Sequence, residues 1–414
     1  MPLNLQGIAL DPVHAQWRRV AKDVATKLAL DADRVDREGE YPTLGVNLLT
    51  SSGLTGLTVP KEKGGAGGNI KTAALVIEEL AQGCASCATC YTMHLSSMTL
   101  MAALASEDQI ERLLLPMMRC GRLNSVAMSE PGSGNRLWHT DSYAERLPSG
   151  YQIDSFKSFA SSSGNAGHYI VPVRASNSVG PTDISLFVID GTDPQVKPVG
   201  RWDGMGLRGS ASTPVHFDKV LVPEGNRLGS ETCGFSMLFA YTLPIYQVGL
   251  SAMYLGIAQA AYDTAVAHVK KRIHSDTGLS LSKLETVQRY IGEMRVRIDQ
   301  SRHLIYRVAQ MADNAVVLFN ELAEADLLDE IIRANPDDPF FIEVAQVKVS
   351  ASEMANDVVA KSFQVCGGSA YKRGHRVERC VRDVRASSVM APSDDTLKLI
   401  IGRQILGIEQ PWEG

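Results

Sequence analysis

Three cysteines at regular spacing are the first residues whose type could do chemistry. Cys84, Cys87 and Cys90 recur every third residue, which would stack them along one side of a helix like the ligands of a zinc ion or an iron–sulfur cluster. No second cluster of Cys or His in the sequence completes such a site. Because unpaired cysteine is also a common small side chain of buried helices, we expect buried thiols here and no metal.

Two segments rich in serine could instead contact a flat ring system. In SVAMSEPGSGN, Ser129 offers a hydroxyl and an amide, and Gly132 and Gly134 allow the backbone to come close. In KSFASSS, Phe159 could stack on a ring face while Ser161 donates at the ring edge. Taken alone, both segments also fit serine-rich turns with ordinary packing.

The residue composition and hydrophobic pattern change twice along the chain, and they predict the helices and strands that position these residues. Residues 1–122 contain long Ala-, Leu- and Met-rich helical patterns, and residues 123–232 contain short β-branched runs between Gly, Ser and Pro clusters. Residues 233–414 return to long helical patterns. An all-β block between two helical blocks is an uncommon order, so it narrows the fold without naming a chemistry.

Composition excludes several classes of function. The chain has 414 residues, 44% of them hydrophobic, and a formal net charge of −5 with scattered basic residues. No apolar run is long enough to span a membrane, and the N-terminal residues lack a secretory signal pattern. Seven cysteines, an odd number, favour reduced thiols. We therefore expect a cytoplasmic protein that acts on a small molecule, with no nucleic-acid or membrane partner.

Four segments resemble, in order, signatures of the acyl-CoA dehydrogenase superfamily. SVAMSEPGSGN resembles the signature in which a Ser or Thr before Glu-Pro-Gly lies against the isoalloxazine ring of FAD. Three later segments resemble further family blocks at family spacing: IDSFKSFASSSGNAGHYIV, DGMGLRGSASTPVHFDKVLVPEGNRLG and FQVCGGSAYKRGHRVERCVRDVR. The resemblance implies an FAD-dependent oxidoreductase of α+β class. Its expected parts are an N-terminal helical domain (1–122), a central β-barrel or sandwich domain (123–232) and a C-terminal four-helix bundle (233–414).

The resemblance also implies which residues hold FAD. These are Met128, Ser129, Gly134, Asn135, Phe159, Ser161, Arg272, Gln288, Gln364, Gly367, Gly368, Ser393 and Asp395. Ser161 would lie near flavin N5, and the set from Arg272 to Gly368 would grip the ADP half, often from a neighbouring subunit. We therefore expect a homodimer or homotetramer. Arginine at a helix end and a glycine pair after a helix also have a purely structural interpretation.

The resemblance fails at the family's catalytic base. Its dehydrogenases remove a proton beside a thioester carbonyl with a Glu, and Ala391 occupies that position here. An alternative base and its neighbouring arginine fall on Tyr246 and Gln247. Asp394 and Asp395 lie about one helical turn beyond Ala391, so either could act as a relocated base.

Relatives without the carboxylate include the flavin-dependent monooxygenases of this fold, which use reduced flavin and O2. Ser161 fits the hydroxyl that such chemistry needs near N5, and His94 is the candidate proton relay, or else a satisfied core histidine. We favour a flavin-dependent oxygenase or atypical oxidase acting on a small organic substrate, free or as a CoA or carrier thioester. A separate flavin reductase or electron acceptor would be its partner. The alternative is an α,β-dehydrogenase of a thioester with a relocated base such as Asp394.

Overall fold

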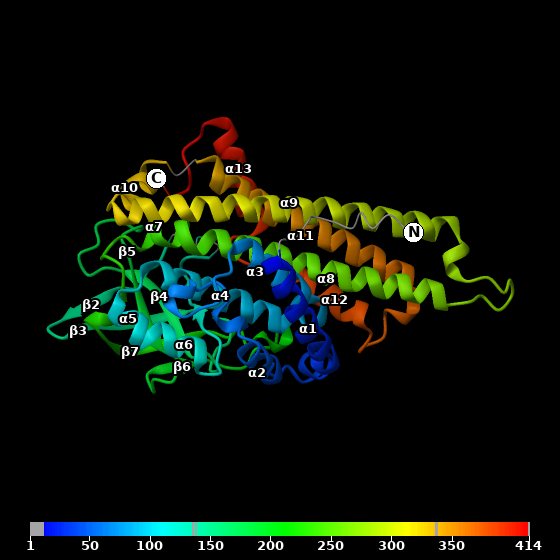
Figure 1. The fold of residues 1–414 in the computed structure, drawn as a ribbon, viewed down its shortest axis with the longest axis horizontal. Coiled ribbons are helices and arrows are strands. Elements are labelled where there is room, and N and C mark those ends of the chain that lie inside the picture. The colour runs from blue at the N-terminus through cyan, green and yellow to red at the C-terminus, as the bar shows by residue number, and fades with distance from the viewer. Residues whose placement is uncertain (1–11, 135, 137–138, 336–337, 413–414) are drawn as a thin grey trace.

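Helices form both ends of the chain and strands form its middle (Figure 1). The computed structural model describes residues 12–134, 136, 139–335 and 338–412. The N-terminal helices are α1 (Pro12–Glu38), α2 (Thr43–Ser51), α3 (Ile70–Gly83), α4 (Ala85–Leu104), α5 (Glu107–Gln109) and α6 (Leu115–Arg119). The C-terminal helices are α7 (Gly234–Met237), α8 (Leu243–Lys271), α9 (Glu285–Glu324), α10 (Leu328–Ala334), α11 (Pro339–Cys366), α12 (Arg376–Val384) and α13 (Asp394–Leu406). This order confirms the predicted α+β class.

The middle strands form a sandwich of two four-stranded sheets. The strands are β1 (Ser125–Val126), β2 (Ala144–Leu147), β3 (Gly150–Lys157), β4 (His168–Arg174), β5 (Ile184–Asp190), β6 (Val196–Pro198), β7 (Val215–Pro223) and β8 (Arg227–Leu228). One sheet has the order β1-β4-β5-β8 and the other β2-β3-β7-β6. Tyr169 and Phe217 meet edge to face across the two sheets, with ring centroids 5.5 Å apart, so large aromatic side chains fill the layer between them.

The helices α3 and α4 connect the N-terminal part to the rest of the molecule. Helix α3 begins at Asn69, whose side chain accepts a hydrogen bond from the Thr72 amide in a capping box. Most residues of α4 are buried, because β1 lies on one side of this helix and α8 on another. Cys84, Cys87 and Cys90 are all buried at the start of α4, in the same apolar core as α8.

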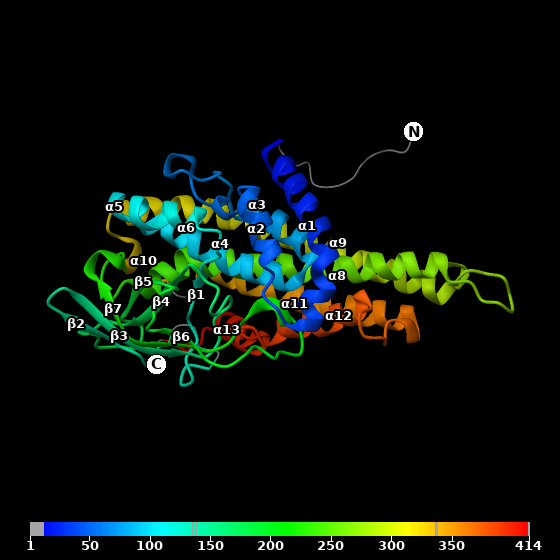
Figure 2. The same cartoon turned by 90° about the horizontal axis from the view of Figure 1, so that it is seen from below.

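Three long helices, α8, α9 and α11, pack along one another, and α12 lies against α8 and α11 (Figures 1 and 2). Helix α3 also packs on α8 and α9, so the N- and C-terminal helices share one core. The buried Glu78 carboxylate of α3 accepts a hydrogen bond of 2.9 Å from Arg302 of α9 and another from the Tyr306 hydroxyl. Within the described residues, no helix is long and apolar enough to cross a membrane.

Candidate active site

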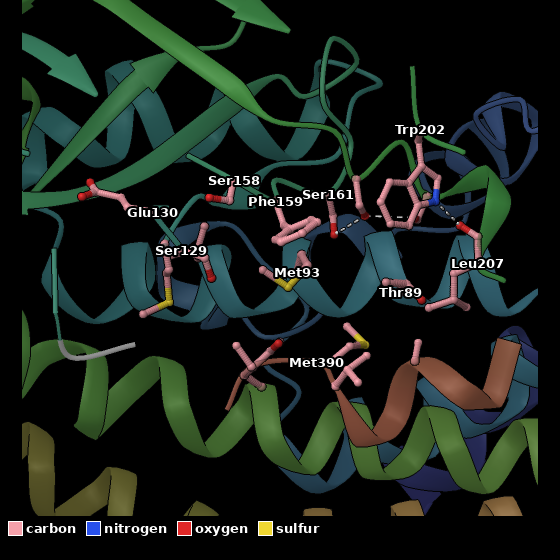
Figure 3. Close-up of a pocket in the computed structure, with 18 of the residues that line it drawn as sticks. Thr89, Met93, Ser129, Glu130, Ser158, Phe159, Ser161, Trp202, Leu207 and Met390 are labelled. Carbon is pink, nitrogen blue, oxygen red and sulfur yellow. Dashed lines mark hydrogen bonds between the residues drawn. The ribbon is translucent and has the colours of Figure 1, made fainter. Parts of the chain in front are cut away.

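A cavity of about 520 Å³ lies where the β-sandwich meets α4 and α8 (Figure 3). Its walls come from β1, the turn from Met128 to Gly134, the turn from Ser158 to Ser161, the loop from Trp202 to Ser212, helix α4, helix α8 with the preceding Thr242, and the segment from Ala386 to Ala391. Two of these are the serine-rich segments that the sequence singled out. The structure therefore brings these two segments, which are separate in the sequence, to the same cavity.

A buried ion pair fixes the turn that carries Ser129. Glu130 Oε1 accepts hydrogen bonds from Lys157 Nζ (2.7 Å) and Thr140 Oγ1 (2.6 Å), and its Oε2 accepts from the Asp141 amide (2.6 Å). Burial alone would raise the pKa of the Glu130 carboxyl, but Lys157 and these hydrogen bonds lower it to about 2. Glu130 is therefore an ionised anchor of the turn and not a free proton acceptor.

Ser129, Phe159 and Ser161, the residues predicted to contact the flavin ring, lie together on one wall of the cavity. The Ser158 amide donates to the Ser129 carbonyl (2.7 Å), which holds the two serine-rich turns side by side. Phe159 and Trp202 meet edge to face, with centroids 6.5 Å apart. The Ser161 hydroxyl lies 3.3 Å from that of Ser212 (Figure 3). An aromatic ring and hydroxyl groups thus lie on the same side of the cavity.

This wall fits a flavin ring. The Phe159 side chain is 62% exposed although it belongs to a cavity wall, so a planar group could cover its face. Ser161 and Ser212 supply hydroxyl groups beside it, as a ring edge with nitrogen and carbonyl atoms requires. Met128 and Gly134 line the same cavity, and Gly134 adopts a positive φ of 55°, which favours glycine. Asn135 lies outside the described residues.

Ala391 belongs to the segment of the lining that also contains Met390, which lies across the cavity from Phe159 (Figure 3). It lies beside Met390 and Val389, and Tyr246 of α8 completes this side. Burial raises the pKa of the Tyr246 phenol well above its usual range, so the hydroxyl stays protonated near neutral pH. Among the described lining residues, the one carboxylate is Glu130, and it is engaged in the ion pair above. Neither the Ala391 nor the Tyr246 position therefore offers a carboxylate base.

Asp394, the predicted relocated base, is bound elsewhere. Its Oδ1 accepts a hydrogen bond from Lys348 Nζ (2.8 Å), and its Oδ2 accepts one from Ser352 Oγ (2.6 Å). The Lys348 side chain is fully buried and also donates to the carbonyl groups of Met390 and Pro392. Asp394 does not line the cavity. The helical start at Asp394 turns its carboxylate toward α11, so the structure does not support a catalytic role for it.

His94 also lies away from the cavity. Its Nε2 donates to the Thr55 carbonyl (2.7 Å), and its Nδ1 accepts from the Asn124 amide (3.0 Å). The side chain is fully buried, and burial lowers its pKa to about 4. Met93, one residue earlier on α4, lines the cavity instead. The prediction of a catalytic His94 is therefore not supported, because both ring nitrogens join α4 to neighbouring backbone.

The predicted ADP-binding residues lie together at the end of the C-terminal helices that is farther from Tyr246 and the cavity. Arg272 ends α8, Gln288 lies in the first turns of α9, and Gln364 precedes Gly367 and Gly368 at the end of α11. An apolar cluster of side chains from α8, α9, α11 and α12 connects these helix ends. All five residues are exposed. Since α8 rises about 1.5 Å per residue, Arg272 lies about 39 Å from Tyr246 along the helix.

Ser393 and Asp395 lie at the start of α13. The Ser393 hydroxyl accepts a hydrogen bond from the Thr396 amide (3.3 Å) and acts as the N-cap. Asp395 follows in the first helical turn and is exposed. Both therefore have a capping or dipole-complementing role in the chain itself. Their contact with a cofactor stays a prediction.

One group of side chains in the described residues has the spacing of metal ligands. Asp154, His216 and Asp218 have ligand atoms within 4.8 Å of one another on the β3–β7 surface. However, His216 already contacts Asp154 (3.0 Å), and Lys197 pairs with Asp218. This grouping lies on the sandwich surface and contributes nothing to the cavity.

Sequence reasoning missed several parts of this site. Trp202 and Met93 line the cavity, and Lys348 fixes the segment that carries Ala391. The tryptophan lies just before the Gly-Met-Gly-Leu stretch, so proximity to a family block was its available signal. Lys348 lies between Val347 and Val349, and a lysine flanked by apolar residues in a helix indicates a buried partner.

Comparison with known families decides the membership. Models of the acyl-CoA dehydrogenase N-terminal, middle and C-terminal domains match residues 11–120, 125–220 and 238–406. The chain belongs to the acyl-CoA dehydrogenase family. It is 30% identical to the probable acyl-CoA dehydrogenase YngJ of Bacillus subtilis over 392 residues, which cover 94% of this chain and 97% of YngJ. It is 27% identical to the caffeyl-CoA reductase–Etf complex subunit CarC of Acetobacterium woodii, over 94% of this chain and 97% of CarC.

Solved structures agree with this membership. Butyryl-CoA dehydrogenase from Megasphaera elsdenii superposes with a TM-score of 0.86 at 25% identity, covering 97% of this chain and all of that one. Dibenzothiophene monooxygenase TdsC from Paenibacillus sp. A11-2 superposes with a TM-score of 0.81 at 23% identity, covering 96% and 99%. The expectations of a flavin-dependent oxidoreductase and of FAD as its cofactor are confirmed.

Proposed function

We propose that this acyl-CoA dehydrogenase-family protein is a flavin-dependent oxygenase of a small, largely apolar organic substrate. The observation that carries the proposal is the makeup of the cavity. The wall that would face the flavin ring has Phe159 and Ser161. A dehydrogenase would need a proton acceptor on the other side of the substrate, but the cavity has Ala391 and an un-ionised Tyr246 there. Hydroxyl groups can donate hydrogen bonds, but a neutral hydroxyl removes an α-proton poorly at neutral pH.

The chain's own residues can bind, orient and exclude water. FAD, once bound and reduced, supplies electrons to O2. Ser161 and Ser212 can donate hydrogen bonds to a group held at the ring edge, because their hydroxyls adjoin each other on the wall. Met93, Met128 and Met390 surround the space between the walls with apolar, adaptable side chains, which keep water out. No proton transfer by a carboxylate is required in this arrangement.

The lining also indicates the chemistry of the substrate. Apart from the paired Glu130, the described lining residues carry no charge, so an ionised group held deep in the cavity would be left without a partner. A neutral apolar or aromatic compound fits better. The monooxygenase TdsC shows that this fold accommodates such an enzyme, since one of its structures holds indole.

Oxygen labelling tests the proposal. The holoenzyme is reduced with dithionite under nitrogen and mixed with buffer that contains 18O-labelled O2 and a panel of neutral heteroaromatic compounds, beginning with indole. We expect a product that contains one labelled oxygen atom, detected by mass spectrometry. Flavin reoxidation that yields only labelled hydrogen peroxide and water across the panel would contradict the oxygenase proposal.

The Tyr246 hydroxyl favours a second candidate function, the oxidation or reduction of an α,β-bond in a CoA or carrier thioester. It lines the cavity and has no hydrogen bond to another described residue, so it could exchange a proton with a substrate carbon. YngJ and CarC, whose names refer to acyl-CoA and caffeyl-CoA, support this chemistry. Anaerobic addition of a thioester panel tests it: bleaching of the flavin in the wild type but not in Tyr246→Phe would favour this candidate.

We propose further properties that depend on the same assignment. Arg272 lies beyond the reach of one FAD molecule bound at Tyr246, so a second subunit would supply the ADP-binding residues and the protein would be a homodimer or homotetramer. The three family-model matches support domains that divide near residues 122 and 232. A cytoplasmic location and a separate flavin reductase or electron acceptor complete the proposal.

A further inference from the structure

We infer that the substrate cavity extends along α8 to a polar end at Gln247, which binds a neutral hydrogen-bonding group on the tail of the substrate. The inference deepens the proposed function, because it assumes that the cavity holds the substrate. It adds a recognition site for one chemical class, a hydroxyl or carboxamide group at the end of an apolar chain.

Two small pockets lie next to the main cavity in series. The first has a volume of about 30 Å³ and shares Met128, Thr242 and Tyr246 with the cavity as lining residues. It is walled otherwise by apolar side chains such as Phe235 and Leu238. Phe235 belongs to α7, whereas Leu238, Phe239 and Thr242 of the lining belong to a π-helical turn, Leu238–Thr242, that leads directly into α8. An apolar hollow therefore adjoins the cavity at Tyr246.

The second pocket has a volume of about 40 Å³ and shares Phe239 and Leu243 with the first. Its remaining walls come from α11, α13, Pro392, Trp412 and Gln247 of α8. The three hollows therefore form a series in which each adjoins the next through shared side chains. The side chain of Gln247 lies in the last of them.

Gln247 is the unusual member of this pocket. Its side chain is 1% exposed, yet neither Oε1 nor Nε2 has a hydrogen-bond partner among the described residues. A buried polar group without a partner is costly, so native proteins nearly always satisfy such groups with protein, water or ligand atoms. One side-chain amide offers both an acceptor and two donors. A group that itself donates and accepts, such as a carboxamide, matches both ends at once.

The surroundings exclude an ionised tail. No charged side chain belongs to the described lining of either small pocket. The buried cation Lys348, which donates to the carbonyl of the pocket residue Pro392, already binds Asp394 and the Met390 carbonyl as well. An ammonium or carboxylate group at Gln247 would therefore lose its hydration without gaining a counterion. A neutral polar group avoids this cost.

Three molecules of nearly equal shape test the inference: hexanamide, hexanoate and 2-methylheptane. Their binding to the FAD-loaded protein is measured by calorimetry and by the shift of the flavin absorbance. Gln247→Leu is expected to weaken hexanamide binding by about tenfold, the effect of one or two neutral hydrogen bonds, and not to weaken 2-methylheptane. Hexanoate is expected to bind more weakly than hexanamide. The matched control Gln259→Leu makes the same change elsewhere on α8, where the Gln259 amide already has partners. This control should leave the affinities for hexanamide and 2-methylheptane unchanged.

A crystal structure with hexanamide gives the second readout and needs no variant. We expect the probe amide to pair with Gln247. An ordered water alone on Gln247 with the probe elsewhere would overturn the inference, as would equal weakening of all three molecules by Gln247→Leu. Gln247→Met replaces the leucine variant if the latter does not retain FAD. Failure of labelled oxygen to enter product would count against the oxygenase and leave this binding result unaffected, so the two failures are distinguishable.

Discussion

Replacing Lys348 tests how the segment that carries Ala391 is held. The Lys348 side chain is fully buried and donates to Asp394 Oδ1 (2.8 Å), the Pro392 carbonyl (3.2 Å) and the Met390 carbonyl (3.3 Å). Burial lowers the pKa of its ammonium group, while the Asp394 carboxylate acts in the opposite direction. Lys348→Met removes the cation and leaves a buried carboxylate and two backbone carbonyls without it.

The magnitude follows from this burial. Removing one partner of a buried ion pair costs about 3–5 kcal/mol, a large part of the roughly 5–15 kcal/mol that stabilises a typical domain. Adding Asp394→Asn removes the uncompensated charge while the side chain can still accept the Ser352 hydrogen bond. We therefore expect the double variant to recover about 2 kcal/mol relative to Lys348→Met, a clear departure from additivity.

Urea unfolding followed by far-ultraviolet circular dichroism measures these differences, with flavin fluorescence as a second probe of the cavity. Lys398→Met is the matched control. Lys398 of α13 pairs with Glu353 at 2.7 Å, but both side chains are at least half exposed, so its loss should cost about 1 kcal/mol or less. If Lys348→Met costs no more than Lys398→Met, or if Asp394→Asn adds to its cost, the account of this ion pair is wrong.

Three further predictions concern the cavity. Phe159→Ala should weaken FAD binding by about tenfold, measured by fluorescence of released flavin, whereas Phe156→Ala on the outer face of β3 should not. Because the folded-state pKa of Glu130 is lowered from 4.5 to about 2, its stabilising contribution is complete above pH 4.5 and is lost as the pH falls toward 2. FAD release in that window should therefore depend on Glu130, and Glu130→Gln should weaken FAD retention at neutral pH and flatten the pH dependence. Tyr246→Phe should retain FAD and leave incorporation of labelled oxygen unchanged, and a loss of that incorporation would assign Tyr246 a role in oxygen chemistry.

The sequence predicted the fold and the cofactor because the family segments carry their own local geometry. Ser129, Phe159 and Ser161 lie in tight turns next to strands, so their positions follow from motif spacing once the strands pair. Ala391, the residue predicted to replace the family's base, likewise lines the cavity. These residues could be assigned without knowing any distant contact.

The other site residues depend on contacts that are remote in the sequence. Asp394 follows Ala391 closely, but its direction is set by Lys348, 46 residues away. His94 lies next to Met93 on α4, and their side chains point about 100° apart around the helix axis, so the rotation of the helix decides which of them lines the cavity and which contacts Thr55. Periodicity alone does not specify that rotation for a helix that is buried on nearly all sides.

The central claim is that none of the described side chains lining the cavity removes an α-proton from a thioester. The most direct test incubates the FAD-loaded protein with butyryl-CoA in D2O without oxygen and follows the α-hydrogen signal by NMR. We expect no exchange of α-hydrogen for deuterium in the wild type, and exchange only after Ala391→Glu places a carboxylate at that position. Exchange by the wild type that disappears in Tyr246→Phe would contradict the claim and assign the proton transfer to Tyr246.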